Sequence, residues 1–302
     1  MESGNRLVAH VPPEMACRAV DAGACKASGP LPSTFALGVL AGAFIALGAC
    51  FYTTVVSGIP PAPIGPARLV GGLCFSLGLI LVVVGGAELF TGNILIIMAV
   101  LCGRARPAHL ARNWAIVYMG NLVGSLLICV LAYFAWHWKL GGGAVGATAY
   151  SIAAKKLSLP FGTAFCSGIL CNFLVCLAVW LCYAGRTVTD KILAIIFPIT
   201  AFVALGFEHS IANMYFVPYA MLLCHTQGFT ATHPVAPITV PSFLADNLLP
   251  VTLGNIIGGL GVGVVYWFVY LRPAADRAAL PFILTGTNAD PTVADSELST
   301  PR

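Results

Sequence analysis

The chain has 302 residues, of which 59% are hydrophobic and only 9% are charged. Soluble domains usually have about 25% charged residues, so this chain has too little polar surface to cover a globule in water. The net charge of +4 is small, and the basic residues form no patch interleaved with aromatic side chains, which argues against a nucleic-acid partner.

The first segment, residues 1–32, does not resemble a cleaved signal peptide, because charged residues are spread through it and it has no continuous apolar core. We expect a cytoplasmic N-terminal segment here, followed by a six-span transmembrane domain over residues 33–272. Residues 273–302 are rich in Thr, Asp and Pro, and this composition predicts a mobile cytoplasmic tail.

Apolar runs of about 20 residues are long enough to cross a bilayer. The sequence predicts an all-α membrane protein with six crossings. Four of these crossings are simple runs: Thr34–Val56, Asn113–Trp138, Leu157–Gly185 and Asn247–Leu271.

The second and fifth crossings are predicted to be interrupted. A single helix over Leu69–Gly103 would be about 52 Å long, which exceeds a hydrocarbon core of about 30 Å. We expect this run to break at Gly85-Gly86, beside Glu88. The fifth crossing is predicted as two pieces, Ile192–Phe207 and Ser210–Leu223, on either side of Glu208-His209.

Basic residues determine the expected orientation. Six crossings place both termini on one side, and if that side is the cytoplasm, eleven Lys and Arg residues lie inside against four outside. An excess of basic residues marks cytoplasmic segments. We therefore expect a multi-pass protein of a plasma membrane or bacterial inner membrane, surrounded by lipid, with both termini in the cytoplasm.

Two patterns occur twice in the same order. The pattern GxExxxxN occurs at Gly86–Asn93 and Gly206–Asn213, and GNxxG occurs at Gly120–Gly124 and Gly254–Gly258. The first copy enters the membrane from the inside and the second from the outside. The sequence therefore predicts an inverted 3+3 repeat, in which broken helices meet near the midplane and form the transport path.

Ionisable residues deep in apolar segments indicate either a function or a pairing partner. Glu88 and Glu208 could hold the broken helices together by accepting backbone N–H bonds, and Lys156 could pair with Glu208. His209 stands where a helix breaks, and irregular backbone at that depth is typical of a cavity lining or of a buried contact. Its imidazole titrates near neutrality, so it could hydrogen-bond a weak-acid anion or give it a proton.

Further polar side chains lie in the same apolar surroundings, namely the amides of Asn93, Asn172 and Asn213 and the hydroxyl of Thr91. We expect Asn93 and Asn213, with Glu88, to support the helix breaks. Helix N-termini at these breaks would favour an anion over a cation. The pattern leaves open whether the nearby apolar residues face a pore, the core or lipid: Phe75, Leu79, Phe90, Val175 and Phe202.

Cysteine is abundant, with eleven residues. Most of them lie in apolar runs and none forms a CxxC pair, so the sequence favours small buried side chains over disulfides or a metal site. The examples in apolar runs are Cys74, Cys129, Cys166, Cys171, Cys176 and Cys182. We expect no metal and no cofactor.

From about Lys26 to Arg272 the chain resembles the formate/nitrite transporter family. The segments that carry the resemblance are Arg68–Leu79 (RLVGGLCFSLGL), Glu88–Asn93 (ELFTGN), Tyr118–Gly124 (YMGNLVG), Gly206–Met214 (GFEHSIANM) and Asp246–Gly258 (DNLLPVTLGNIIG). The resemblance implies a homopentamer with an aquaporin-like fold and one pore in each subunit.

The resemblance also implies roles for residues. Thr91 and His209 correspond to the central polar site. The group that draws the anion in and connects it to the histidine corresponds to Lys156, Asn172 and Glu208. The outer constriction corresponds to Phe75 and Phe202, and the inner one to Leu79, Phe90 and Val175.

The formate branch of the family matches best, through Ala178-Val179-Trp180 after Asn172 and the run that starts at Asp246. The expected function is transport of formate and related small monocarboxylate anions, coupled to protons through His209. Nitrite, hydrosulfide, acetate and lactate branches share the same core and remain alternatives.

Three other classes of protein fit the sequence less well. A neutral-solute channel of the aquaporin type would have Asn-Pro-Ala motifs, and none occurs. A membrane metalloprotease would have HExxH, which is also absent, so we do not expect an enzyme. A purely structural membrane protein would not need interrupted spans.

Overall fold

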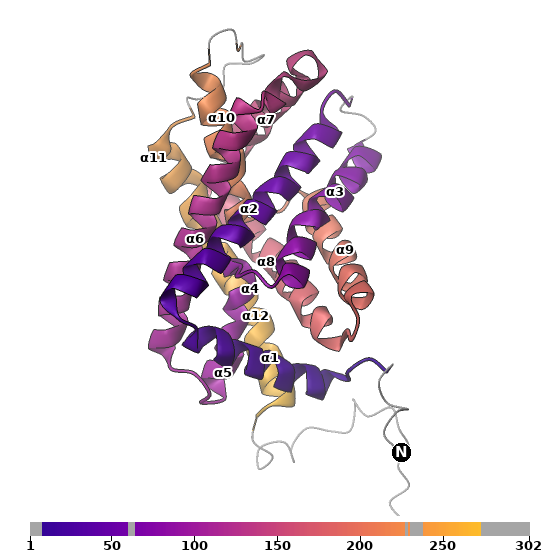
Figure 1. Ribbon diagram of the computed structural model, residues 1–302, viewed down its shortest axis with the longest axis vertical. Helices are drawn as coiled ribbons and strands as arrows, with labels where there is room; N and C mark the ends of the chain where they lie inside the picture. Colours follow the sequence, from indigo (N-terminus) through magenta and orange to yellow (C-terminus); the bar gives the residue numbers. More distant parts are fainter. Residues whose placement is uncertain (1–7, 60–63, 227–228, 230–237, 273–302) are drawn as a thin grey trace, which may run out of the picture. The chain divides into compact units, whose positions relative to one another are not determined.

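The computed structural model describes residues 8–59, 64–226, 229 and 238–272, and within these ranges all regular structure is helical. Residues up to Leu271 form one compact unit, and its helices are drawn in Figure 1. The tail over 273–302, for which the sequence predicts mobility, lies outside the described residues.

Six helices in the described residues are long and apolar enough to cross a membrane, which confirms the predicted number of crossings. They are α2 (Leu31–Val56), α3 (Ile64–Gly85), α6 (Pro107–Phe134), α8 (Phe161–Ala184), α9 (Val188–Leu205) and the continuous run Val240–Tyr270. That last run consists of α11 (Val240–Ser242), a π-helical turn (Phe243–Leu248) and α12 (Leu249–Tyr270).

Some helix ends differ from the predicted ones, and proline explains two of the differences. Helix α6 begins at Pro107 rather than at Asn113, because proline is well suited to the first turn of a helix. It ends at Phe134, and Trp136 then adopts a left-handed conformation with φ of 58°. Helix α8 begins after Pro160, since Leu157 belongs to the preceding helix.

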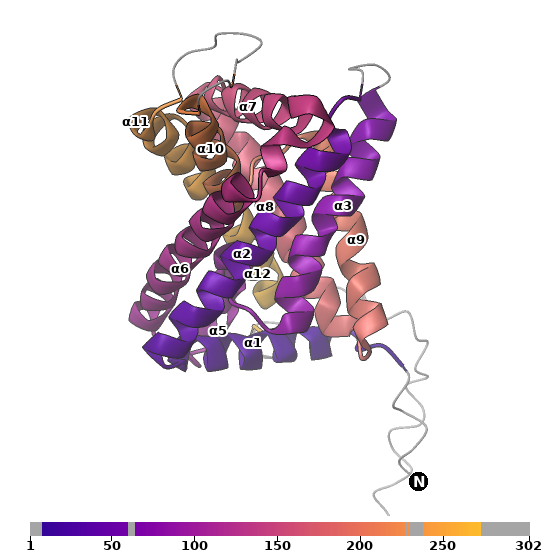
Figure 2. The ribbon, with the colours of Figure 1, turned by 45° about the horizontal axis from the view of Figure 1, so that its top comes forward.

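Two helices lie across opposite ends of the spans, α1 (Pro12–Ser28) and α7 (Ala144–Leu157) (Figure 2). Helix α1 was not predicted, although its start has Pro12 and Glu14 and its last turn has Lys26. It docks through buried side chains that contact α5 and α8: Met15, Ala16, Ala19 and Val20 against Met98, Ala99 and Trp180.

Two short apolar helical segments follow α3 and α9. After α3, residues 86–89 are not helical, and α4 (Phe90–Asn93), a 3-10 turn (Ile94–Ile96) and α5 (Ile97–Leu101) follow. After α9, residues 206–209 are not helical, and α10 (Ser210–Cys224) follows. Both irregular stretches start with a glycine at positive φ, +74° at Gly86 and +77° at Gly206, which only glycine adopts without strain.

Glycines bring α2 close to α6 and α8 close to α12. A Cβ at Gly124 would collide with the carbonyl oxygen of Val39, and one at Gly258 with the carbonyl oxygen of Ile169. Small residues that let backbones approach are typical of helix pairs in membranes, where packing rather than the hydrophobic effect drives association. These two pairs bring the flanking asparagines Asn121 and Asn255 close to their partners.

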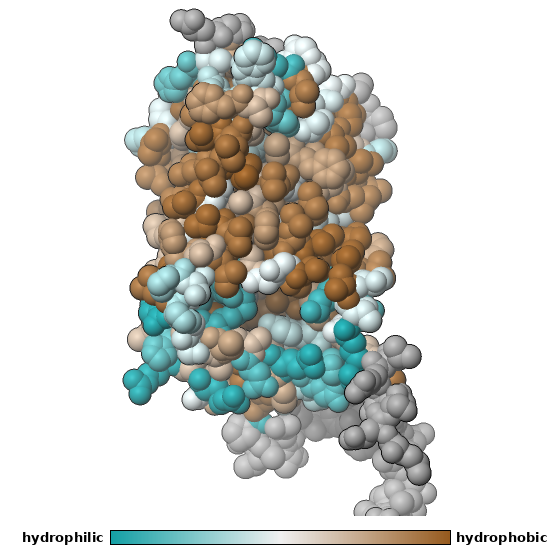
Figure 3. Space-filling view, viewed as in Figure 1, coloured by the Kyte–Doolittle hydropathy of each residue, from teal (hydrophilic) through white to brown (hydrophobic). Residues whose placement is uncertain are grey.

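The surface drawn in Figure 3 is hydrophobic over the middle of the spans, and polar residues gather toward the α1 end. Many large side chains on α3, α6 and α9 are exposed, for example Phe134 at 74% and Phe197 at 75%. This distribution fits surroundings of lipid or of neighbouring subunits rather than water.

The substitution Gly124→Ala tests the close packing of α2 against α6. We expect it to lower the free energy of unfolding by about 2 kcal/mol, because the added methyl group forces two backbones apart. Gly261→Ala is the matched control, since nothing lies within 4 Å of a Cβ there; alanine should stabilise that helix by up to about 1 kcal/mol. Equal thermal unfolding of both variants in detergent would contradict the packing argument.

Candidate functional site

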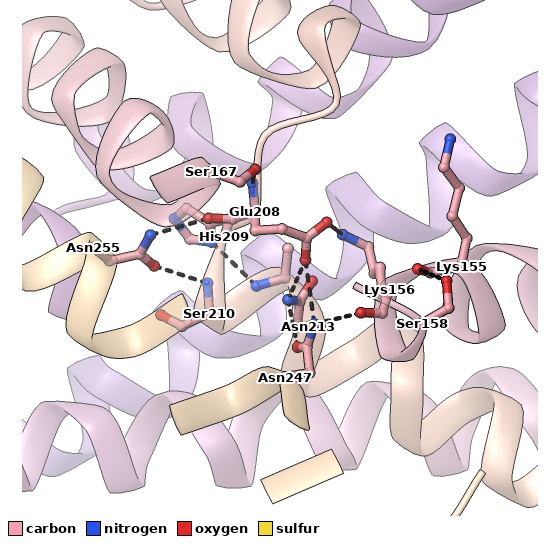
Figure 4. Close-up of polar contacts among 11 residues, drawn as sticks. Lys155, Lys156, Ser158, Ser167, Glu208, His209, Ser210, Asn213, Asn247 and Asn255 are labelled. Atoms are coloured by element: carbon pink, nitrogen blue, oxygen red, sulfur yellow. Dashed lines mark hydrogen bonds and ion pairs between the residues drawn. The ribbon is translucent and has the colours of Figure 1, made fainter. Parts of the chain in front are cut away.

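The stretch 206–209 is held by a network of side chains around Glu208 (Figure 4). Lys156 Nζ lies 2.9 Å from one carboxylate oxygen, and Asn213 Nδ2 donates to the other at 2.7 Å. Asn213 Nδ2 also donates to Asn247 Oδ1 at 2.7 Å, and Asn247 Nδ2 donates to the backbone carbonyl of Lys156 at 3.2 Å. The network therefore links α7, α10 and the π-helical turn to the irregular stretch.

Asn255 on α12 bonds to the backbone on both sides of His209. Its Oδ1 accepts from the Ser210 amide at 2.9 Å, and its Nδ2 donates to the carbonyls of Glu208 at 3.0 Å and Gly168 at 2.8 Å. Backbone groups at the ends of helices lack partners within the helix, and burying them unpaired is costly. One amide side chain therefore satisfies groups that the non-helical stretch leaves open.

The same arrangement surrounds Glu88. Lys26 Nζ lies 2.8 Å from one carboxylate oxygen, and Asn93 Nδ2 donates to the other at 2.5 Å. Asn93 Nδ2 also donates to Asn113 Oδ1 at 2.9 Å, and Asn113 Nδ2 donates to the carbonyl of Lys26 at 3.1 Å. Asn121 bonds the Phe90 amide and the carbonyls of Glu88 and Gly38, at 2.8 to 3.0 Å.

Both glutamates therefore use their carboxylates to bind side chains, and the asparagines of the two GNxxG patterns bind the backbone. Lys156, which the sequence suggests as a partner of Glu208, is paired with it in the structure. Lys26, which pairs with Glu88 from α1, was not predicted. The sequence does contain a signal for this pair, because the two lysines have matching positions. Lys26 precedes the first crossing of the first half of the chain, and Lys156 precedes the first crossing of the second half.

His209 and Thr91 come together from the two irregular regions. His209 Nδ1 accepts a hydrogen bond from the Ala212 amide at 3.1 Å, so the neutral ring carries its proton on Nε2. That Nε2 lies 3.1 Å from Thr91 Oγ1. The ring also stacks on Phe202, with centroids 5.8 Å apart. Both polar residues are buried, with 2% of His209 and 0% of Thr91 exposed.

Asn172 fixes the backbone at Thr91. Its Nδ2 donates to the Thr91 carbonyl at 3.2 Å and to the Asn255 carbonyl at 2.7 Å, which ties α4 to α12. Its Oδ1 is buried and has no hydrogen-bond partner among the described residues. Cys176 Sγ also contacts the Thr91 carbonyl, at 3.4 Å.

Two cavities approach this contact, one near each end helix. We call them the α7-side vestibule and the α1-side vestibule. The α7-side vestibule is lined by charged residues, His209 and four phenylalanines, among others: Arg68, Lys155, Lys156, Glu208, Phe75, Phe202, Phe207 and Phe216. The α1-side vestibule is lined chiefly by Lys26, Leu79, Val82, Glu88, Leu89, Gly92, Asn93 and Lys191. His209 lines the α7-side vestibule, whereas Thr91 lines neither cavity and the next residue, Gly92, lines the α1-side vestibule.

Three of the five predicted constriction residues line one or the other vestibule. The rings of Phe75 and Phe202 meet edge to face in the α7-side vestibule, with centroids 5.6 Å apart, and Leu79 lines the α1-side vestibule. Val175 is buried and lines neither. Phe90 packs against Trp114 and Tyr118 and lines a lateral apolar groove instead. Pore roles for all five residues stay predictions.

All eleven cysteines are free. Four of the examples from apolar runs are buried, whereas Cys74 is partly exposed and Cys166 is exposed. The expectation of burial is therefore wrong for Cys166, because α8 turns that side chain away from the core. Among the described residues no group of three or more His, Cys, Asp or Glu could hold a metal ion.

Comparisons with known proteins agree on one family. The family model described as formate/nitrite transporter matches residues 13–268. The formate channel FocA of Escherichia coli (strain K12) is 44% identical over 280 residues, covering 90% of this chain and 98% of that protein. The probable formate transporter of Methanothermobacter thermautotrophicus is 41% identical over 267 residues, covering 82% of this chain and 92% of that protein.

Solved structures agree as well. A pentameric formate channel with formate bound aligns with a TM-score of 0.75 at 42% identity, over 80% of this chain and 98% of that one. An ion channel of the same family aligns with a TM-score of 0.72 at 29% identity, over 84% of this chain and 98% of that one. This chain is therefore a multi-pass membrane transport protein that belongs to the formate/nitrite transporter family.

Proposed function

We propose that this protein carries formate and related small monocarboxylate anions across the membrane through a path that passes His209. The observation that carries the proposal is the buried His209–Thr91 contact between two vestibules that both contain cations. The names of the relatives support formate as substrate. Nitrite, lactate, acetate and hydrosulfide remain alternatives for the same path.

We propose further that α3 with α4 and α5, and α9 with α10, are two interrupted spans of an inverted repeat with an aquaporin-like arrangement. The matched networks support this: each has a lysine on an end helix, a glutamate, and two asparagines in the same roles. The copies differ at the residue after each glutamate, which is Leu89 in the first and His209 in the second. The imidazole on the proposed path therefore occurs in the second copy and has no counterpart at the matching position of the first.

The proposed mechanism rests on the cost of a bare ion in apolar surroundings. A carboxylate that passes Phe75, Phe202 and Leu79 would lose most of its hydration, and unpaired charges in such media cost many kcal/mol. A proton on the anion removes most of that cost. His209 Nε2 would hold the anion by a hydrogen bond while water supplies the proton. Direct transfer from Nε2 would require the ring to take up a proton on Nδ1 first, which would break the hydrogen bond from the Ala212 amide.

Thr91 has a complementary role in this mechanism. Its hydroxyl lies 3.1 Å from His209 Nε2, too close for a carboxylate to sit between them, so the pair must separate when the anion arrives. The two groups would then each bond one carboxylate oxygen. Because Asn172 holds the Thr91 backbone, the separation would come from side-chain rotation.

We propose a homopentamer for this chain, and the similarity to a pentameric formate channel supports that assembly. We also propose a cytoplasmic location for both termini, which the bias of basic residues supports. The α1-side vestibule would then open to the cytoplasm.

The substitution His209→Phe tests the mechanism. In liposomes, wild-type formate flux should rise as external pH falls and should be coupled to proton movement. His209→Phe should lose the pH response and lower flux at least tenfold, because the carboxylate loses its donor. Size-exclusion chromatography checks that the variant still assembles. Full flux with an unchanged pH response would leave His209 as a structural tie only.

Substrate choice is tested in the same liposomes with formate, acetate, lactate, nitrite and hydrosulfide at equal concentration. We expect formate to pass faster than acetate and lactate, since these larger anions must move the facing rings of Phe75 and Phe202. Formate should also pass faster than nitrite and hydrosulfide, an expectation that the names of the relatives support rather than anion size. Faster passage of lactate or nitrite than of formate would assign the chain to another branch of the family.

Cysteine labelling tests the orientation. A cysteine in place of Ala108, in the first turn of α6, should react with a membrane-impermeant maleimide added outside only after the cells are permeabilised. The parent chain, with its native cysteines, gives the background. Labelling of Ala108→Cys from outside intact cells would reverse the proposed orientation.

A further inference from the structure

One lysine in each vestibule is neutralised by a glutamate. Lys156 Nζ lies 2.9 Å from Glu208, and Lys26 Nζ lies 2.8 Å from Glu88. Each pair contributes a net charge of about zero at a distance, so an approaching anion gains little from it. The attraction must therefore come from cations that have no carboxylate partner.

Each vestibule is lined by one such cation that lies on a membrane-spanning helix. Arg68 is in the second turn of α3 and lines the α7-side vestibule, and Lys191 is in the first turn of α9 and lines the α1-side vestibule. Neither forms an ion pair among the described residues. Both side chains are partly buried.

Arg68 is held in place by one of its five N–H groups. Its Nη1 donates to the Ala204 carbonyl at 3.1 Å, at the end of α9. Gly206 lies beside it, and a Cβ there would be 3.7 Å from Nη1. The guanidinium therefore lies next to the stretch that leads to His209, and no other hydrogen bond to a described residue uses its remaining donors.

Asp190 precedes Lys191 in sequence, but its carboxylate already accepts hydrogen bonds from the backbone. Asp190 accepts from the backbone amides of Arg186 and Thr187, both at 2.9 Å, in the capping box that starts α9. The ammonium of Lys191 therefore faces the α1-side vestibule. Glu88 is the one carboxylate among the described residues that line this vestibule, and it is already bonded by Lys26 and Asn93.

We propose that Arg68 and Lys191 are the docking cations for the transported anion, one in each vestibule. This inference rests on the proposed function. A guanidinium presents parallel N–H groups that match the two oxygens of a carboxylate, whereas an ammonium acts as a point charge. A vestibule with apolar walls also concentrates the field of an unpaired cation. Arg68 thus captures and orients the anion ahead of Phe75 and Phe202, and Lys191 captures it on the other side.

Lys155 is a poorer candidate, although it lines the α7-side vestibule. Its side chain points away from the network of Glu208 in Figure 4, and no ion pair or hydrogen bond with a described residue fixes its ammonium. An unfixed lysine loses more entropy when it binds an anion than a guanidinium that is already anchored.

The test compares Arg68→Gln and Lys191→Gln in liposomes that contain the protein in one orientation, at low ionic strength. Glutamine keeps a donor for the Ala204 carbonyl and removes the charge. Arg68→Gln should raise the half-saturation concentration for formate about tenfold from the α7 side, as expected for one charge-assisted hydrogen bond, and leave the α1 side within twofold. Lys191→Gln should show the opposite side preference.

Three further variants sharpen the result. Arg68→Lys keeps the charge without the parallel donors and should give an intermediate rise. Lys139→Gln and Arg106→Gln remove exposed cations at the two ends that line neither vestibule, and they should match the wild type. Salt should reduce the difference between Arg68→Gln and the wild type, because it screens the attraction. Unchanged half-saturation in both glutamine variants, or equal effects in the controls, would overturn the proposal.

A binding measurement separates this proposal from the proposed function. Solubilised wild-type protein should broaden the NMR line of ¹³C-formate, and the double variant Arg68→Gln/Lys191→Gln should not. Broadening that depends on these two residues without formate flux would uphold docking and overturn formate transport. Flux with normal half-saturation in the variants, and broadening that persists in the double variant, would uphold transport and overturn docking.

Discussion

The structure depends on one constraint: backbone groups that leave a helix inside an apolar environment must still be hydrogen-bonded. Residues 86–89 and 206–209 are such places, and Asn121 and Asn255 meet the need with three hydrogen bonds each. The asparagines can do so only because glycines let α6 approach α2 and α12 approach α8. Close packing of helices, rather than local sequence, therefore fixes where His209 and Thr91 lie.

The glutamates help to hold the two irregular stretches in place by binding side chains rather than the backbone. Each carboxylate binds an asparagine of the following helix and a lysine of an end helix, so α1 and α7 are tied to the irregular stretches by charge. Removing one partner from such a pair would leave a buried charge uncompensated, which costs about 3–5 kcal/mol. The lysines are thus engaged in structure, which is why anion capture falls to other cations.

The sequence predicted six apolar spans and the family, because length, hydropathy and motifs are local properties. It also named the polar residues that meet at the candidate site, and their roles in transport stay predictions. It did not predict α1, whose apolar face becomes evident only against Met98, Ala99 and Trp180. Nor did it pair Lys26 with Glu88, because Lys26 lies on α1, the helix that was not predicted. Periodicity also cannot tell which way Phe90 points; packing against Trp114 and Tyr118 decides that.

The two halves of the chain solve the same structural problem with the same residues, and one difference between them lies at the proposed path. Leu89 and His209 both precede the first residue of a helix and have similar backbone angles, φ −105° and ψ 124° against φ −114° and ψ 116°. The backbone angles there do not require an imidazole, since leucine adopts them in the first copy. His209 differs in that it caps α10, because its Nδ1 accepts from the Ala212 amide, whereas Leu89 provides no side-chain cap. Capping needs only an acceptor such as Ser, Asp or Asn, so it does not account for the second ring nitrogen, which lies 3.1 Å from Thr91 Oγ1. This second nitrogen supports the proposal that His209 acts on the anion that passes it.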